Sequence, residues 1–157
     1  MKFTEKCKKS SGNELLDVAC GTGKHLSFLK KHYSCTGIDI NSEMLKIAKK
    51  KLPDVEFSKQ SMTTFNFKKK FDIITCLFSS IGYAKSYPIL KKTISNFTSH
   101  LKEGGIVIIE PWFSRKTFKQ GLPVMTTYDC DNMKIARLSV SKKIKNISIL
   151  EFHYLVA

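Results

Sequence analysis

The sequence predicts an α/β fold: a Rossmann-like, doubly wound, mostly parallel sheet with an antiparallel hairpin extension at its C-terminal end. Three observations lead to this prediction. Five short apolar segments alternate with stretches of helical periodicity between residues 13 and 112, which is typical of repeated β-α-β units. The first apolar segment runs through a glycine turn into helical sequence. Beyond Pro111 the helical period is lost, and β-branched and polar residues alternate.

The glycine turn follows a strand predicted over residues 13–19 and precedes a helix predicted over residues 23–33. A helix that begins in such a turn presents free backbone N–H groups and a positive dipole end, and glycines let a ligand approach bare backbone. The turn therefore predicts a site for a nucleotide-like or carboxylate-bearing ligand. Gly21 and Gly23 fit the dinucleotide fingerprint G-x-G-x-x-G, but Leu26 occupies its third glycine position, which argues against a dehydrogenase.

The second strand is predicted over Ser34–Ile40 and contains Asp39 near its end. Ligands of doubly wound sheets bind beyond the carboxyl ends of the strands, where the strand order reverses. A carboxylate there can accept two hydrogen bonds from ribose hydroxyls, or it can cap the next helix. Asn41 or Ser42 is expected to cap that helix. Met44, on the apolar side of the helix, can lie along a purine or belong to the core.

The third strand is predicted over Val55–Phe57, and residues 60–62 follow it where backbone N–H groups could read an adenine edge. The fourth strand, Phe71–Phe78, is dense in apolar residues, as expected for a strand covered on both faces. It leads into a loop, residues 76–83, that we expect to lie beside the glycine turn.

Helical spacing returns from Pro88 to about Leu101, and Gly104-Gly105 is expected to end that helix. Residues 106–110 form the predicted fifth strand. Glu110 stands at its end, where it can make a polar contact with a ligand or cap a backbone turn.

The remaining residues, 113–157, are predicted to hold a short helix over 114–120 and then a hairpin. The hairpin pairs Ile135–Ile144 with Ile147–Val156 around a turn at Lys145-Asn146. We interpret this segment as a flap or dimer contact. The whole chain, 1–157, is thus expected to form one domain with its cofactor-binding core at 13–112.

The formal net charge is +14, and the 27 basic residues include only two arginines. A solvated lysine-rich surface and attraction of an anionic partner, such as RNA or a phosphorylated metabolite, are both compatible with this charge. The scarcity of arginine is not typical of proteins that read nucleic acids.

Five cysteines without C-x-x-C spacing argue against a disulfide framework and a zinc site, and favour a reducing cytosol, hence a cytoplasmic location. The N-terminal residues lack the apolar core of a signal peptide, and no apolar run approaches the length of a membrane span. We therefore expect no metal ligands and no membrane partner.

These motifs resemble those of class I S-adenosylmethionine-dependent methyltransferases over residues 14–112. The sequence is more specifically similar to sugar-nucleotide N-methyltransferases, which methylate the amine of a TDP-linked amino sugar. The segments that carry the resemblance are Leu16–Gly23, Gly37–Asp39, Phe71–Ile74, Cys76–Tyr83, Glu110–Phe113 and Glu151–Tyr154.

The resemblance implies S-adenosylmethionine as cofactor and in-line methyl transfer to a small-molecule acceptor, most specifically at an amine nitrogen. The cofactor-binding residues that it implies are Ala19, Cys20, Gly21, Gly23, Asp39, Ile40, Met44, Ser61, Met62, Cys76 and Phe78. The substrate-binding residues that we expect are Ser79, Tyr83, Trp112 and Phe113, although Trp112 and Phe113 can instead pack against the fold. Tyr83 could orient an acceptor through its hydroxyl and Glu110 through a polar contact, so these two are the expected catalytic residues, with orienting roles.

The sequence departs from the family at Ser61, where an acidic residue is usual. Parts of the family fold are also expected to be absent at both ends. Three hypotheses follow: a small-molecule N-methyltransferase, an RNA methyltransferase favoured by the lysine charge, and a truncated cofactor-binding protein without activity. The expected partners are a small-molecule acceptor and a second copy bound through the C-terminal strands, whereas nucleic acid is not favoured.

Overall fold

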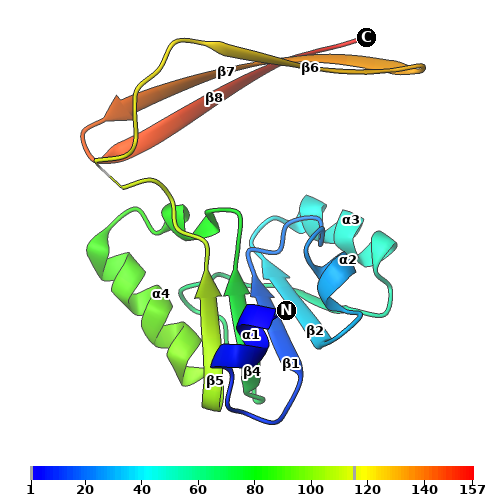
Figure 1. Cartoon of the computed structure of the whole chain (residues 1–157), viewed down its shortest axis with the longest axis vertical. Coiled ribbons are helices and arrows are strands. Elements are labelled where there is room, and N and C mark those ends of the chain that lie inside the picture. Colours follow the sequence, from blue (N-terminus) through cyan, green and yellow to red (C-terminus); the bar gives the residue numbers. More distant parts are fainter. Residues whose placement is uncertain (1, 115) are drawn as a thin grey trace. The chain divides into compact units, whose positions relative to one another are not determined.

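The computed structural model describes residues 2–114 and 116–157. The chain divides into two compact units between Trp112 and Phe113. The first unit holds a five-stranded sheet and the second a three-stranded sheet (Figure 1). Among the described residues, no helix is long and apolar enough to cross a membrane.

The first unit is a parallel sheet with the strand order β3-β2-β1-β4-β5 (Figure 1). Its elements are α1 (Lys2–Cys7), β1 (Glu14–Val18), α2 (Leu26–Leu29), β2 (Ser34–Asp39), α3 (Ser42–Lys51), β3 (Glu56–Lys59), β4 (Phe71–Cys76), the 3-10 helix η1 (Ser80–Tyr83), α4 (Tyr87–Ser99) and β5 (Leu101–Ile109). The strand order reverses between β1 and β4, which sets the ligand-binding edge of such sheets there. The predicted fold class is confirmed.

Neighbouring residues of β1 enter two different cores because side chains alternate across a strand. Leu15 packs in a cluster with residues of α2 and α3, whereas Leu16 packs in a cluster with residues of α4. Every residue of β4 is buried, as its dense apolar sequence predicts for a strand covered on both faces.

The predicted cap of α3 is confirmed at Asn41. Its side-chain oxygen accepts hydrogen bonds from Glu43 N at 3.0 Å and Met44 N at 3.2 Å. This cap satisfies two of the orphan N–H groups at the helix start. It fixes where α3 begins, immediately after the carboxyl end of β2.

Gly104-Gly105 does not end α4, which stops at Ser99; both glycines lie inside β5. The N-terminal segment crosses β5 at this point, and Gly104 O accepts hydrogen bonds from Lys9 N at 2.9 Å and Ser10 N at 3.1 Å. A Cβ on Gly104 would lie 2.9 Å from Ser10 N. The glycine is therefore required by a close backbone approach in a strand.

One further local prediction was wrong near the N-terminal end. The helix predicted over 23–33 is regular only at α2, with turns on either side. Before β1, the chain also forms a short helix, α1. The residue at the N-cap position of α2, His25, makes no side-chain capping bond. Without a cap, a segment this short gains little from helix formation alone.

The second unit is an antiparallel sheet of β6 (Val124–Cys130), β7 (Met133–Ile144) and β8 (Ile147–Val156), in that order. The predicted β7–β8 hairpin is confirmed, with Lys145 in its turn at φ 52°. β6 was not predicted as a separate strand.

The helix predicted over 114–120 does not form in the described residues of that segment. Ser114 and Thr117 instead close a single turn, in which Ser114 N donates to Thr117 Oγ1 at 2.9 Å and Phe118 N donates to Ser114 O at 2.9 Å. Hydroxyl side chains of this kind compete with helical hydrogen bonding.

Candidate active site

The loops after β1, β2, β3, β4 and β5 carry the residues that the sequence singles out for binding. Because all five strands are parallel, these loops share one edge of the sheet (Figure 1). Every predicted site residue except Phe113 belongs to the first unit. Phe113 begins the second unit and is described with it.

Backbone strain is concentrated at the ends of β1 and β4, which are neighbours in the sheet. Among the described residues, four non-glycine residues have positive φ, and three of them lie here: Ala19 (59°), Phe78 (51°) and Ser79 (58°). Gly21 and Gly23 add φ values of 55° and 74° in the same turn as Ala19. Such a conformation costs a non-glycine residue about 1–2 kcal/mol. Strained backbone tends to cluster where ligands bind.

Asp39 joins the end of β2 to the glycine turn. Its side chain is 8% exposed. Oδ2 accepts a hydrogen bond from Gly21 N at 2.8 Å, and Oδ1 accepts one from Asn41 N at 2.8 Å. A carboxylate offers about four acceptor positions, so each oxygen can accept a further donor. The helix cap of α3 is Asn41, and Asp39 holds the loop that precedes it.

Ile40 and Met44 form an apolar surface beside this carboxylate. They are 68% and 43% exposed. A Cβ on Gly21 would lie 3.6 Å from Met44 Sδ, which places the thioether next to the glycine turn. Of the two interpretations of Met44, core residue or ring-facing residue, its position favours the second.

The loop after β3 reaches the same region through Gln60, whose N–H donates to Asp39 O at 3.1 Å. Ser61 Oγ shares a hydrogen bond with Thr63 Oγ1 at 3.0 Å and accepts one from Thr63 N at 3.3 Å. Its hydroxyl is thus engaged within its own turn. Met62 packs against the core cluster on the α4 side.

Glu110 joins the end of β5 to the loop after β4. Its Oε2 accepts a hydrogen bond from Phe78 N at 2.7 Å, and its own N–H donates to Cys76 O at 3.0 Å. Ser79 Oγ donates to Pro111 O at 3.1 Å. Of the two sequence interpretations of Glu110, the structure therefore shows the one in which it caps a backbone turn.

Two aromatic side chains project from this loop. Phe78 is 82% exposed and Tyr83 is 76% exposed. Trp112 lies against the loop, since a Cβ on Gly82 would be 3.2 Å from Trp112 Cβ. The β4–β5 side of the site thus offers exposed rings, whereas the β1–β2 side offers a carboxylate and a glycine turn.

Asp17 lies near the end of β1, just before the glycine turn, and has no predicted role in the site. It is 1% exposed, and its Oδ1 accepts a hydrogen bond from Thr75 Oγ1 at 2.7 Å. Oδ2 has no hydrogen-bond partner in the part of the chain that the structure describes. Burial raises the pKa of Asp17 to about 6. The signal in the sequence was a carboxylate inside an otherwise apolar strand, just before the glycine turn.

The two buried thiols at this edge are not activated. Burial, reinforced by the Asp17 charge, raises the pKa of Cys76 to about 12 and moves the pKa of Cys20 upward as well. Thiols are nucleophilic as thiolates, so both side chains act as apolar packing at neutral pH.

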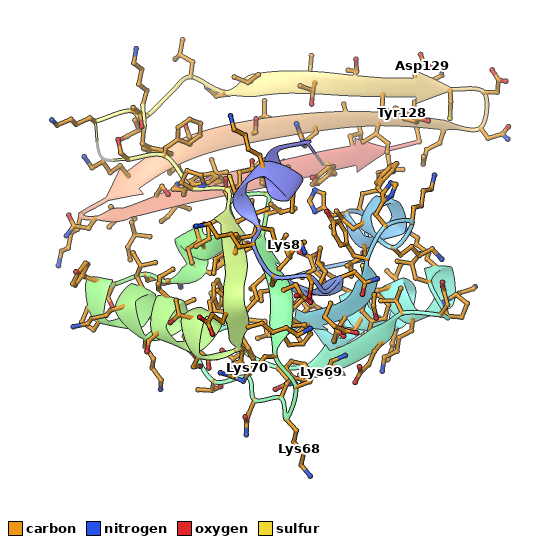
Figure 2. The ribbon with its side chains drawn as sticks, turned by 60° about the horizontal axis from the view of Figure 1, so that its bottom comes forward. Lys8, Lys68, Lys69, Lys70, Tyr128 and Asp129 are labelled. Carbon is orange, nitrogen blue, oxygen red and sulfur yellow. The ribbon has the colours of Figure 1, made fainter. Side chains whose placement is uncertain are left out.

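The run Lys68–Lys70 lies in the loop before β4, at the amino ends of the strands and away from the carboxyl-edge loops (Figure 2). Lys69 pairs with Glu14 at 3.3 Å and with Glu56 at 3.7 Å, and lies 5.3 Å from the ring centre of Phe71. This basic run is therefore separate from the candidate site.

The described arrangement can hold a nucleoside with a charged tail. Asp39 retains acceptor capacity for hydroxyl groups, Met44 and Ile40 offer flat apolar contact, and the glycine turn allows close approach. The unpartnered Oδ2 of Asp17 favours a donor or a positive charge beneath that turn.

Comparison with known proteins shows the family to which the chain belongs. Residues 15–105 match the family described as "Methyltransferase domain". The chain is 37% identical over 146 residues to dTDP-3-amino-3,4,6-trideoxy-alpha-D-glucopyranose N,N-dimethyltransferase of Streptomyces venezuelae. It is 34% identical over 144 residues to dTDP-3-amino-3,6-dideoxy-alpha-D-glucopyranose N,N-dimethyltransferase of Streptomyces fradiae. These matches cover 92% and 91% of the chain, but 62% and 56% of the two relatives.

Solved structures extend the likeness to the fold of nearly the whole chain. The crystal structure of Streptomyces venezuelae DesVI matches with a TM-score of 0.94 and 34% identity, over 99% of this chain and 66% of that one. A sugar N-methyltransferase from a Streptoalloteichus species matches with a TM-score of 0.91 and 32% identity, over 99% of this chain and 63% of that one.

Proposed function

The chain belongs to the methyltransferase-domain family and has the class I fold, and from this membership we propose that it transfers a methyl group from S-adenosylmethionine to an amine nitrogen of a small acceptor. We further propose a sugar nucleotide as the acceptor. Relatives named as dTDP-amino-sugar N,N-dimethyltransferases support this choice. The chain spans about three fifths of their length, so the activity of the whole protein is part of the proposal.

The observation that carries the proposal is the bond between Asp39 and Gly21. It places a carboxylate with free acceptor capacity beside a turn that a ligand can approach closely. Asp39 would accept ribose hydroxyls, Ile40 and Met44 would flank the adenine, and Gly21 and Gly23 would receive the methionine end. When bound, the cofactor supplies an electrophilic methyl group on a sulfonium.

The protein's own part in the reaction is alignment and exclusion of water. A neutral amine is already nucleophilic, so a strong general base is not required, and the protonated thiols of Cys20 and Cys76 do not compete for the methyl group. We place Phe78, which the resemblance assigns to the cofactor, with Ser79 and Tyr83 on the β4 side, where all three would contact the acceptor. Tyr83 has a hydroxyl with which to orient it.

The acceptor is tested by incubating the full chain with methyl-labelled S-adenosylmethionine and either a dTDP-amino sugar or RNA. The proposal expects label in the sugar nucleotide. Label in RNA, with an affinity that falls steeply as salt rises, would favour the RNA methyltransferase instead. Donor binding without label in either acceptor would favour a cofactor-binding protein without activity.

We also propose that one face of the antiparallel sheet contacts a second copy of the chain. Cross-strand pairs share a face, and one face gathers exposed apolar side chains: Val124, Tyr128, Met133, Leu150, Phe152, Tyr154 and Val156. The other face carries the ion pairs Lys134–Asp129 and Lys142–Glu151 and a smaller set of exposed apolar side chains: Met125, Leu138, Ile144, Ile147 and Leu155.

Exposed apolar patches of this kind mark protein contacts, and a two-fold contact would bury the same patch on both copies. In analytical ultracentrifugation the unchanged chain should sediment as a dimer and the Phe152→Lys variant as a monomer. The matched variant His153→Lys, which places the same charge on the opposite face, should remain a dimer. A monomeric unchanged chain would contradict this proposal and favour a flap.

A further inference from the structure

Phe78 and Ser79 are consecutive non-glycine residues with left-handed backbone, at φ 51° and 58°. Neither side chain favours this conformation, because the Cβ atom crowds the following carbonyl oxygen. Two such residues in succession persist only where neighbouring contacts hold them. The conformation directs Phe78 to the surface, where it is 82% exposed.

The bond that holds this conformation comes from Glu110. Its carboxylate accepts the Phe78 N–H at 2.7 Å, whereas the other contacts of the loop join neutral groups. A bond to an ionised carboxylate is roughly twice as strong as a bond between neutral groups. Glu110 is itself fixed, because its N–H donates to Cys76 O at 3.0 Å.

This arrangement parallels the one on the other side of the site. In each case a carboxylate at the end of one strand accepts a hydrogen bond from a backbone N–H in the loop after the neighbouring strand. Asp39 accepts it from Gly21, and Glu110 accepts it from Phe78; both donors have positive φ. The strand order puts the first pair on the β1–β2 side and the second on the β4–β5 side. The two halves of the site are therefore held separately.

We propose that Glu110 is a positioning residue for the methyl acceptor: it acts through the backbone of Phe78 and Ser79, and it leaves the donor half of the site unaffected. The inference rests on the proposed function. It assigns Glu110 a role that needs no contact with substrate. It also predicts that Glu110 becomes less important when glycine, which adopts positive φ without strain, replaces a residue of this loop.

The test compares Glu110→Ala, Glu110→Gln and the double variant Glu110→Ala/Ser79→Gly with the unchanged full chain. Loss of a hydrogen bond to a charged group should lower kcat/KM for the amino-sugar acceptor by roughly 10–100-fold in Glu110→Ala. The dissociation constant for S-adenosylhomocysteine should stay within about twofold, because Asp39 and Gly21 are untouched. Glu110→Gln, which keeps a side-chain oxygen acceptor, should retain an intermediate activity.

The double variant separates positioning from a direct contact. Glycine adopts positive φ freely, so Glu110→Ala should cost roughly tenfold less activity in the Ser79→Gly background than in the unchanged chain if Glu110 acts by holding the backbone. Ser79→Gly alone is the reference for the double variant, because Ser79 is itself an expected acceptor contact. Glu103→Ala, which removes an exposed carboxylate of β5, is the control for charge and should change nothing. An equal cost of Glu110→Ala in both backgrounds, or an equal loss of donor affinity, would overturn the inference.

Hydrogen exchange tests the positioning role of Glu110 without measuring methyl transfer, so its result does not depend on the proposed function. Hydrogen exchange at the Phe78 amide should be roughly tenfold faster in Glu110→Ala than in the unchanged chain. If the unchanged chain neither binds the donor nor methylates an amino sugar, the proposed function fails and the positioning role fails with it. An unchanged exchange rate in an active protein would overturn the positioning role alone.

Discussion

The carboxylate of Asp39 accepts a hydrogen bond at 2.8 Å from the backbone N–H of Gly21. This bond crosses from the end of β2 to the turn after β1, which pair as parallel neighbours. The bond fixes the distance between the Asp39 carboxylate and the glycine turn. A ligand bound at the turn would therefore lie at a defined distance from Asp39. Such a fixed distance is needed to recognise a ribose and the group attached to it at the same time.

Replacing Asp39 with alanine should weaken S-adenosylhomocysteine binding by about 1.5–3 kcal/mol, the range for a hydrogen bond to a charged group. Isothermal calorimetry measures this loss directly. Asp54→Ala is the matched control, since it removes an exposed carboxylate that pairs with Lys30. Equal affinities for the Asp39 variant and the unchanged chain would mean that the ribose lies elsewhere.

Gly23→Ala should destabilise the first unit. Gly23 has φ +74°, and a Cβ there would lie 3.0 Å from Leu52 Cδ1 and 3.5 Å from Ala48 Cβ. The backbone conformation alone should cost about 1–2 kcal/mol in urea unfolding. Gly121→Ala is the control, because its Cβ would meet only Ser141 Oγ at 3.5 Å. Equal stability of the two variants would contradict the strained turn.

The buried carboxyl of Asp17 should make stability depend on pH in a defined direction. Burial is the main cause that raises its pKa, from 3.8 to about 6; Thr75, His25 and Asp39 contribute smaller effects. A raised folded pKa means that the folded state favours the proton. The stabilisation is then complete below the unfolded pKa and is lost as the pH rises through about 6.

Asp17→Asn removes this titration. Between pH 4 and pH 7 the unfolding free energy of the variant should therefore rise relative to that of the unchanged chain, by roughly 2–2.5 kcal/mol. Urea unfolding at a series of pH values, with both proteins in the same buffers, measures the difference. A difference that stays constant with pH would show that Asp17 is ionised equally in both states.

Asp72 anchors the N-terminal segment to the sheet at the amino ends of the strands. Its buried carboxylate accepts hydrogen bonds from Gly12 N at 3.1 Å, Glu14 N at 3.0 Å and Lys102 Nζ at 2.8 Å. Asp72→Ala should destabilise the fold by roughly 1–3 kcal/mol, because it leaves the partly buried N–H groups of Gly12 and Glu14 without their partner. Thermal unfolding checks this, and a melting temperature equal to that of Asp54→Ala would contradict it.

The strands and the glycine turn could be predicted because their signals are local. Apolar runs of strand length and the Gly21–Gly23 turn stand out in the sequence, and Asp39 falls where the second strand should end. Gly104-Gly105 was misread as a helix end, because nothing local shows that the N-terminal segment crosses β5 there. A glycine pair is typical both of a helix end and of a place where two backbone segments approach closely, so the sequence does not distinguish the two.

The strain at Phe78 and Ser79 could not be predicted, since neither residue type favours positive φ. It depends on Glu110, which is 32 residues away in the chain. For the same reason, the sequence alone could not decide whether Glu110 contacts a ligand or caps a backbone turn. Asp17 was visible as a carboxylate in an apolar strand, but its unpartnered oxygen is a property of the packed fold.

We propose that S-adenosylmethionine binds at the carboxyl edge of the five-stranded sheet. Calorimetry of the unchanged chain with S-adenosylmethionine and S-adenosylhomocysteine tests it most directly. We predict saturable binding of both ligands, at one site per chain, with dissociation constants below the millimolar range. Absence of heat from either ligand at millimolar concentration, with a folded protein, would contradict the account.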